Sequence, residues 1–177
     1  MTISTTPEPV LHPDFSSPGA VATSWAEVVA ALEGTRIFRL STVRADGRPH
    51  VCPLPAMWLD GRLFFVTGLE EQKARNLARD PRCVLSTGTD DYRRGLDVVV
   101  EGRAERWTDR PVLEALAQMW RDRLDWPYDV DDDGFRHHVD GHAPNPDGAS
   151  LPVFGVRPDK ILAFSRGEHF AQTRFRP

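Results

Sequence analysis

The sequence contains few of the features that mark secreted, membrane-spanning or nucleic-acid-binding proteins. It has two cysteines, Cys52 and Cys83, too few for a disulfide framework or for a zinc site of their own. No apolar run approaches the ~20 residues that cross a bilayer. The first residues have neither the basic start nor the apolar stretch of a secretory signal, and the net charge of −4 lacks the basic excess of nucleic-acid binders. We therefore expect a cytoplasmic protein with free thiols and no membrane or nucleic-acid partner.

The sequence does have the composition of a globular protein. Its 177 residues, 40% hydrophobic and 27% charged, suit one domain with a core. Residues 1–23 are rich in Ser, Thr and Pro and predict a flexible N-terminal arm before a domain over residues 24–177. Residues 36–82 hold nine Lys or Arg against five Asp or Glu, whereas residues 121–147 hold three against eight. The basic part suits an anionic small molecule.

Alternating apolar residues predict a series of short strands. We expect them over residues 37–43, 49–59, 63–67, 82–87, 96–107, 153–156, 160–165 and 170–175. Most are joined by hairpin signals, such as Asp60-Gly61, which favours an antiparallel barrel over a parallel α/β sheet. Pro53 and Pro55 each remove a ladder hydrogen bond, so we expect their strand at an edge or a break of the sheet.

Three helices are predicted between the strands. A capping box indicates the first over residues 24–34, and a short second helix ends at Asp80-Pro81. The third covers residues 109–124, with an apolar face made of Val112, Leu116, Met119 and Trp120. Residues 125–151 then form a long acidic loop, and a loop of that length is either functional or mobile.

Two patterns in this loop resemble metal sites. Residues 129–134 read D-V-D-D-D-G, the first half of a calcium loop, with Asp140 at its twelfth position. Trp126-Pro127 breaks the incoming helix, and the prolines after His142 exclude an outgoing one. Three histidines have neither fixed spacing nor a Cys or Glu partner: His137, His138 and His142. We therefore predict a solvated acidic loop and no metal site.

The stretch VTGLEEQKARNLARDPR, residues 66–82, holds the strongest candidate for a binding residue. Lys73 lies in the first turn of the second predicted helix, where free backbone N–H groups and the ammonium charge suit a phosphate. On helical spacing, Glu71, Arg75 and Arg79 form a separate salt-bridged stripe facing solvent. From spacing alone, Lys73 either binds an anionic ligand or pairs with a local carboxylate such as Asp80.

The order of motifs around this stretch resembles a known family. A strand, a D-G-R-P turn, a proline-bearing strand, a D-G hairpin and a strand ending in T-G precede Q-K-A-R-N-L-x-R-D-P-R. This order is similar to the flavin-binding split-barrel family that includes pyridoxamine 5′-phosphate oxidase, and within it to the actinobacterial flavin/deazaflavin oxidoreductases. The similarity covers residues 25–107 and the C-terminal Q-T-R-F. It implies a mainly β fold, a six-stranded antiparallel Greek-key split barrel with flanking α-helices, and a homodimer with the cofactor at its interface.

The resemblance also implies a binding site for FMN or F420. By position, the cofactor-binding residues are Cys52, Pro53, Leu54, Pro55, Val66, Thr67, Gln72, Lys73, Asn76 and Arg174. The proline-bearing strand passes beside the ring, and the end of the next strand contacts the ring or its ribityl chain. Gln72 and Lys73 hold the phosphate, and Arg174 reaches a cofactor, that of the neighbouring subunit. No catalytic side chain is identified.

The chain departs from the family pattern where the phosphate is held. Cys52 stands where the oxidases place an Arg, and Glu71-Gln72 stands where they place Ser-Arg. Two phosphate partners are missing and an acid is added, which predicts a weaker FMN site. Either an arginine compensates (Arg48, Arg75 or Arg174), or the cofactor is F420.

These expectations describe an oxidoreductase that passes a hydride between FMN or F420 and an unidentified small molecule, the cofactor supplying the chemistry. The alternative is a non-catalytic protein that carries a flavin, F420 or haem in the same barrel.

Overall fold

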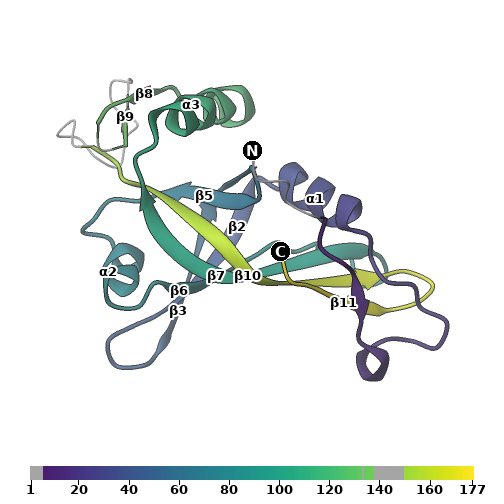
Figure 1. Ribbon diagram of the computed structural model, residues 1–177. Helices are drawn as coiled ribbons and strands as arrows, with labels where there is room; N and C mark the ends of the chain where they lie inside the picture. The colour runs from purple at the N-terminus through teal and green to yellow at the C-terminus, as the bar shows by residue number, and fades with distance from the viewer. Residues whose placement is uncertain (1–5, 133, 138–149) are drawn as a thin grey trace.

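The computed structural model describes residues 6–132, 134–137 and 150–177. Within these residues the protein is mainly β, with antiparallel strands and three α-helices (Figure 1). The strands are β1 (Val10–Leu11), β2 (Ile37–Val43), β3 (Pro49–Pro55), β4 (Met57–Leu59), β5 (Arg62–Val66), β6 (Arg82–Ser86), β7 (Gly95–Trp107), β8 (Tyr128–Val130), β9 (Phe135–His137), β10 (Val153–Arg166) and β11 (Ala171–Phe175). The helices are α1 (Trp25–Gly34), α2 (Gln72–Arg79) and α3 (Arg110–Leu124). None of the helices in this part of the chain is long and apolar enough to cross a membrane.

Six of the strands form an antiparallel split barrel, as the sequence predicted: β2, β3, β5, β6, β7 and β10. The sheet runs in the order β1-β11-β10-β7-β6-β2-β3, and β5 pairs with β10 on one side and with β4 on the other. β3 and β5 lie close to each other without a shared ladder of hydrogen bonds. The barrel is therefore split at the proline-bearing strand.

That strand confirms the expectation drawn from its prolines. The predicted strand 49–59 divides at Ala56 into β3 and β4, and β3 is the last strand in the sheet order. A proline cannot donate to a neighbouring strand, so the free edge carries Pro53 and Pro55 at little cost. The hairpin to β5 also forms as predicted, with positive φ angles at Asp60 (48°) and Gly61 (78°).

The long strand β10 differs from the prediction. Pro158 interrupts the apolar alternation, and we expected two strands there, over 153–156 and 160–165. The structure instead has one strand whose register against β7 shifts between Pro158 and Lys160. A bulge of this kind bends a strand and increases its twist without ending it. Before the bulge β10 pairs with β5, and after it with β11, so one strand serves both the barrel and its extension.

Two hydrophobic clusters lie on opposite sides of the barrel wall. The first fills the barrel and includes Val28 and Leu32 of α1, whose predicted capping box is formed. The second packs α3 and the β8–β9 hairpin against the outer face of β4 and β5 (Figure 1). The fully buried residues of α3 are Leu113, Leu116, Ala117 and Trp120. The predicted face of α3 is thus correct at its centre, while Val112 and Met119 lie at its edges.

Two segments expected to lack regular structure contain some. In the N-terminal arm, Val10–Leu11 pairs with β11, and Pro13–Phe15 forms a 3₁₀ turn. Within residues 125–151, β8 pairs with β9, and Tyr128 and Phe135 pack on Trp120. The β1–β11 pairing joins segments at opposite ends of the chain, which local patterns do not reveal, whereas β8 and β9 form a short local hairpin inside the acidic stretch. The division into an arm of residues 1–23 and a domain of residues 24–177 stays a prediction.

Candidate functional site

A cavity of about 480 Å³ lies where β3, the end of β5 and the start of α2 meet the C-terminal end of α3. Its volume falls in the range of about 300–1,000 Å³ that is typical of small-molecule sites. Pro53, Leu54 and Pro55 of β3 form one apolar wall. Because β3 is the edge strand of the split, no further strand pairs with it on this side.

Aromatic residues from the end of α3 and from β8 face the same cavity. Trp120 and Tyr128 are almost completely buried, and Trp126 keeps 40% of its surface exposed. Trp126 meets the Tyr128 ring edge-on, with the ring centres 6.3 Å apart. Burial raises the pKa of Tyr128 to about 12, so its phenol stays neutral at ordinary pH. These side chains give the cavity a flat, apolar lining suited to an aromatic ligand.

Arg123 fixes the position of this aromatic lining. Its guanidinium donates to the carbonyl oxygens of Glu33 and Thr35, where α1 ends, and its Nη1 lies 3.5 Å from Met57 Sδ. A cation at the C-terminal end of a helix is favourable because the last carbonyls lack helical partners. Asp125 then takes a left-handed conformation, with φ at 56°, and ends α3 beside the cavity.

The α2 side of the cavity is polar and is organised around Glu71. The ammonium of Lys73, a residue only 7% exposed, pairs with Glu71 Oε2. The other carboxylate oxygen accepts from the Thr67 hydroxyl and from the Gly68 N–H, each at 2.9 Å. Burial alone would raise the pKa of Glu71, but the hydrogen bonds from these three donors outweigh it and hold that pKa below 4.5. The carboxylate is therefore ionised.

The sequence allowed two roles for Lys73, binding of an anionic ligand or pairing with a local carboxylate, and the structure partly distinguishes them. Lys73 does pair with a local carboxylate, but the partner is Glu71, whereas Asp80 is bound by Arg82 at 2.7 Å. The pair nevertheless faces the cavity, since both residues line it. Lys73 therefore lies at the cavity with its charge already balanced, and its binding of a ligand stays a prediction.

The structure brings six of the ten predicted site residues together around the cavity: Pro53, Leu54, Pro55, Val66, Thr67 and Lys73. Gln72 and Asn76 do not line the cavity: Gln72 donates to Asn76 at 2.8 Å, and Asn76 donates to Thr42 of β2 at 2.9 Å. The bond from Asn76 to Thr42 attaches α2 to the barrel, and the bond from Gln72 lies within α2 and orients the Asn76 amide. The predicted cofactor contacts of Gln72 and Asn76 stay predictions.

Cys52 and Arg174 are likewise not among the residues that line the cavity. Cys52 precedes the proline wall, and its thiol donates to the Pro53 carbonyl at 3.4 Å. Arg174 is exposed on β11, where its backbone is the register partner of Val10 and Leu162. A contact of Arg174 with the cofactor of a neighbouring subunit stays a prediction.

The predicted salt-bridged stripe on α2 is wrong in its pairing. Arg75 binds Glu70 at 2.8 Å instead of Glu71, and Arg79 donates to the carbonyls of Val43 and Arg44. Glu71 is the residue before the helix, with extended φ and ψ, so helical spacing does not apply to it. Among the arginines proposed to compensate at the phosphate, Arg48 pairs with Asp46 and Arg75 with Glu70.

Sequence reasoning missed the part of the cavity that comes from α3 and the following segment: Trp120, Leu124, Asp125, Trp126, Pro127, Tyr128 and Leu151. The sequence feature that could have indicated this part of the cavity is the presence of Trp126 and Tyr128 at the start of an otherwise acidic loop. The calcium pattern does not converge in the part that is described, since Asp131 pairs with Arg136 and accepts from Ser150. The remaining candidates, Asp133, Asp140, His138 and His142, lie outside the described residues. Within those residues no three His, Cys, Asp or Glu side chains gather as a metal site.

Comparison with known proteins agrees with this fold. The family described as pyridoxamine 5′-phosphate oxidase matches residues 24–143. No curated protein sequence matches at a significant level. Similar solved structures include the conserved hypothetical protein Rv2991 from Mycobacterium tuberculosis, with a TM-score of 0.63 and 23% identity over 83% of this chain and 88% of that one.

Two further structures are similar to a comparable extent. An F420 reductase has a TM-score of 0.53 and 27% identity, over 75% of this chain and 93% of its own. A FAD-binding protein from Mesorhizobium loti has a TM-score of 0.55 and 19% identity, over 86% of this chain and 95% of its own. The extent of the family match and the split barrel lead to one conclusion: the chain belongs to the pyridoxamine 5′-phosphate oxidase family of flavin-binding split barrels.

Proposed function

We propose that the protein is a flavin- or deazaflavin-dependent oxidoreductase that transfers a hydride between FMN or F420 and a small molecule. The observation that carries this proposal is the cavity itself. It gathers the proline wall of β3, the end of β5 and Lys73 of α2 in one place. The likeness to an F420 reductase supports the deazaflavin form of the proposal.

The lining fits the ring of such a cofactor better than it fits a phosphate. The wall of Pro53, Leu54 and Pro55 and the partly exposed ring of Trp126 offer apolar surface to a flat heterocycle. The buried rings of Trp120 and Tyr128 lie behind this lining and help to exclude water. On the α2 side, Thr67 and Lys73 are the donors available to the cofactor's side chain. The ring, when bound, supplies the hydride chemistry, and the protein orients it and keeps it dry.

A homodimer is part of the proposal. Ile37, Val43 and Val51 are 52%, 42% and 57% exposed and lie on the outward face of β2 and β3, beside the proline wall. Large apolar side chains grouped in this way favour contact with another surface. A second copy on this face covers them, closes the split side of the site, and lets Arg174 reach the partner's cofactor. The two free cysteines suit the reducing cytoplasm.

The absorbance spectrum of the purified protein, followed by titration with FMN and with F420, tests binding. Turnover is tested by adding the reduced cofactor to the protein with a panel of electron acceptors. Oxidation that depends on the protein supports the enzyme. Binding without oxidation favours the alternative, a non-catalytic protein that carries the cofactor. The pairing of Lys73 with Glu71 is the observation that favours this alternative, because it weakens the phosphate site.

A further inference from the structure

The start of α2 holds three hydrogen-bond donors that converge on one carboxylate. The Thr67 hydroxyl and the Gly68 N–H both donate to Glu71 Oε1, and Lys73 donates to Oε2. A hydroxyl, a backbone N–H and a buried ammonium beside a helix start are the groups that proteins use to hold a phosphate. Here all three are engaged by a side chain of the chain itself.

Glu71 is itself one of the residues that line the cavity. It lines the cavity together with Thr67, Gly68 and Lys73. The neighbouring charges do not offset it: Arg75 is drawn to Glu70, and Asp125, the other charged residue of the lining, is also acidic. A second anion on the α2 side therefore meets an ionised carboxylate and a lysine whose charge is already balanced.

We propose that Glu71 is a built-in anion that occupies the phosphate position, so that the cavity selects flavin-type ligands that place no phosphate, or only a singly charged phosphodiester, beside α2 over those ending in a phosphate monoester. The proposal rests on the proposed function and specifies its ligand. A phosphate monoester has a second pKa of about 6 and is mostly a dianion at neutral pH. The phosphate of F420 is a diester with one charge, so F420 is favoured over FMN.

Riboflavin and FMN differ only in the phosphate and therefore measure the effect directly. We expect the wild-type protein to bind riboflavin at least as tightly as FMN. Glu71→Gln keeps an oxygen for the Thr67 and Gly68 donors but frees the charge of Lys73. This variant should bind FMN at least tenfold more tightly, a change of about 1.4 kcal/mol, with riboflavin affinity changed less than roughly threefold.

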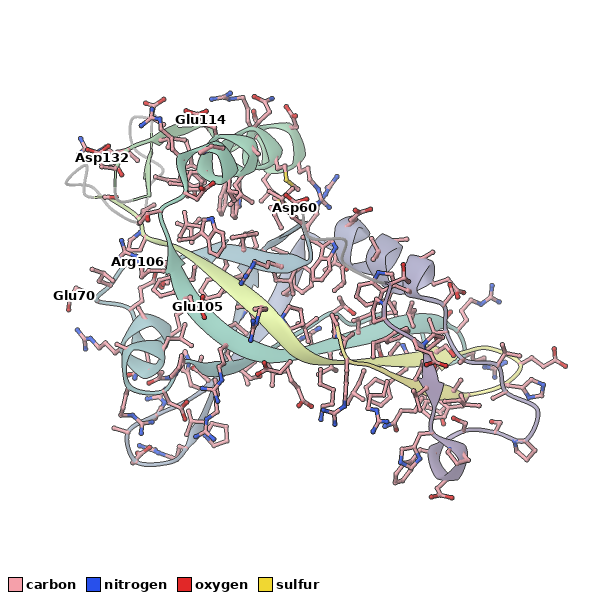
Figure 2. The ribbon with its side chains drawn as sticks, in the orientation of Figure 1. Asp60, Glu70, Glu105, Arg106, Glu114 and Asp132 are labelled. Carbon is pink, nitrogen blue, oxygen red and sulfur yellow. The ribbon has the colours of Figure 1, made fainter. Side chains whose placement is uncertain are left out.

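Glu70→Gln is the matched control. Glu70 is the adjacent acid, but it lies on the outside of the molecule near the start of α2 (Figure 2) and pairs with Arg75. Its removal should leave the ratio of the two flavin affinities unchanged. If Glu71→Gln folds poorly, Glu71→Ser replaces it, because Ser is a favoured residue at the position before a helix.

A second measurement does not depend on flavin binding. Inorganic phosphate in millimolar amounts should raise the melting temperature of Glu71→Gln and leave those of the wild type and Glu70→Gln unchanged. Equal stabilisation of the wild type overturns the proposal, as does a wild type that prefers FMN over riboflavin by about tenfold. If neither flavin nor F420 binds the wild type, the proposed function fails, and the phosphate measurement still decides the role of Glu71.

Discussion

Lys73 and Glu71, two residues apart, form an ion pair on the polar side of the cavity, and the buried lysine owes its balanced charge to the acid before α2. Removing either partner leaves the other uncompensated. The two single variants therefore separate the effect of the positive charge on a ligand from the effect of the negative one.

Lys73→Ala should weaken the binding of FMN and of F420 by at least tenfold, or about 1.4 kcal/mol. The variant leaves the Glu71 carboxylate without its cation, and a phosphate then meets an unbalanced negative charge. Fluorescence titration measures the affinity. Arg75→Ala is the control, since Arg75 is exposed and bound to Glu70. Unchanged affinity in Lys73→Ala would contradict the placement of the ligand next to α2.

The stability provided by the Glu71 network should depend on pH. The pKa of Glu71 is lowered from 4.5 in the folded protein: burial opposes ionisation, but the bonds from Lys73, Gly68 and Thr67 outweigh it. A lowered pKa contributes stability that is present above the unfolded value and lost as the pH falls through the folded value. The gap in unfolding free energy between wild type and Glu71→Gln should therefore be largest near neutral pH and shrink below pH 4.5.

Chemical denaturation at neutral and at acidic pH measures this gap. Because half of the Glu71 side chain is exposed, the gap should be modest. Glu70→Gln, whose side chain is 91% exposed, should show a smaller one. A gap for Glu71→Gln that grows as the pH falls would show that the carboxylate is not stabilised in its ionised form.

Arg123→Ala should loosen the aromatic lining of the cavity. The substitution removes the bonds from Arg123 to the carbonyls of Glu33 and Thr35, which attach the end of α3 to the end of α1. We expect a loss of roughly 1–3 kcal/mol in unfolding free energy, together with weaker cofactor binding. Faster amide exchange over residues 124–128 would locate the change. Arg121→Ala is the control, because Arg121 bonds to Gln118 on the exposed side of the same helix; equal effects from both arginines would argue against an anchoring role.

Val51→Lys should abolish the proposed homodimer. The side chain of Val51 is exposed on β3, and a charge there is costly to bury between two copies. Sedimentation analysis of the wild type should give twice the chain mass of 19.9 kDa, and the variant should give a single chain. Tyr92→Lys, which changes a 92% exposed residue in the connection between β6 and β7, is the control. A monomeric wild type would remove the dimer from the account.

The barrel was largely predictable because its signals are local. Alternation, the Asp60-Gly61 turn and the prolines of β3 each act over a few residues, and each is realised in the structure. Pro158 misled the prediction because a bulge preserves a strand that a proline is expected to end.

The site was predictable only in part. Helical spacing assigned Glu71 to the wrong partner, because the residue before a helix has extended backbone and its side chain can turn back toward Gly68. The aromatic lining depends on the end of α3 lying against the end of α1. Arg123 and Glu33, which make this contact, are 90 residues apart in sequence. No pattern within a single segment carries that information.

The most direct test of the central claim is equilibrium binding of riboflavin, FMN and F420 to the purified wild-type protein. A flavin or deazaflavin ring held between the β3 prolines and the aromatic lining around Trp126 should bind with a Kd below roughly 100 µM, or about −5.5 kcal/mol. At least one of the three should reach that affinity. Weaker binding of all three would contradict the assignment of this cavity as a flavin-type cofactor site.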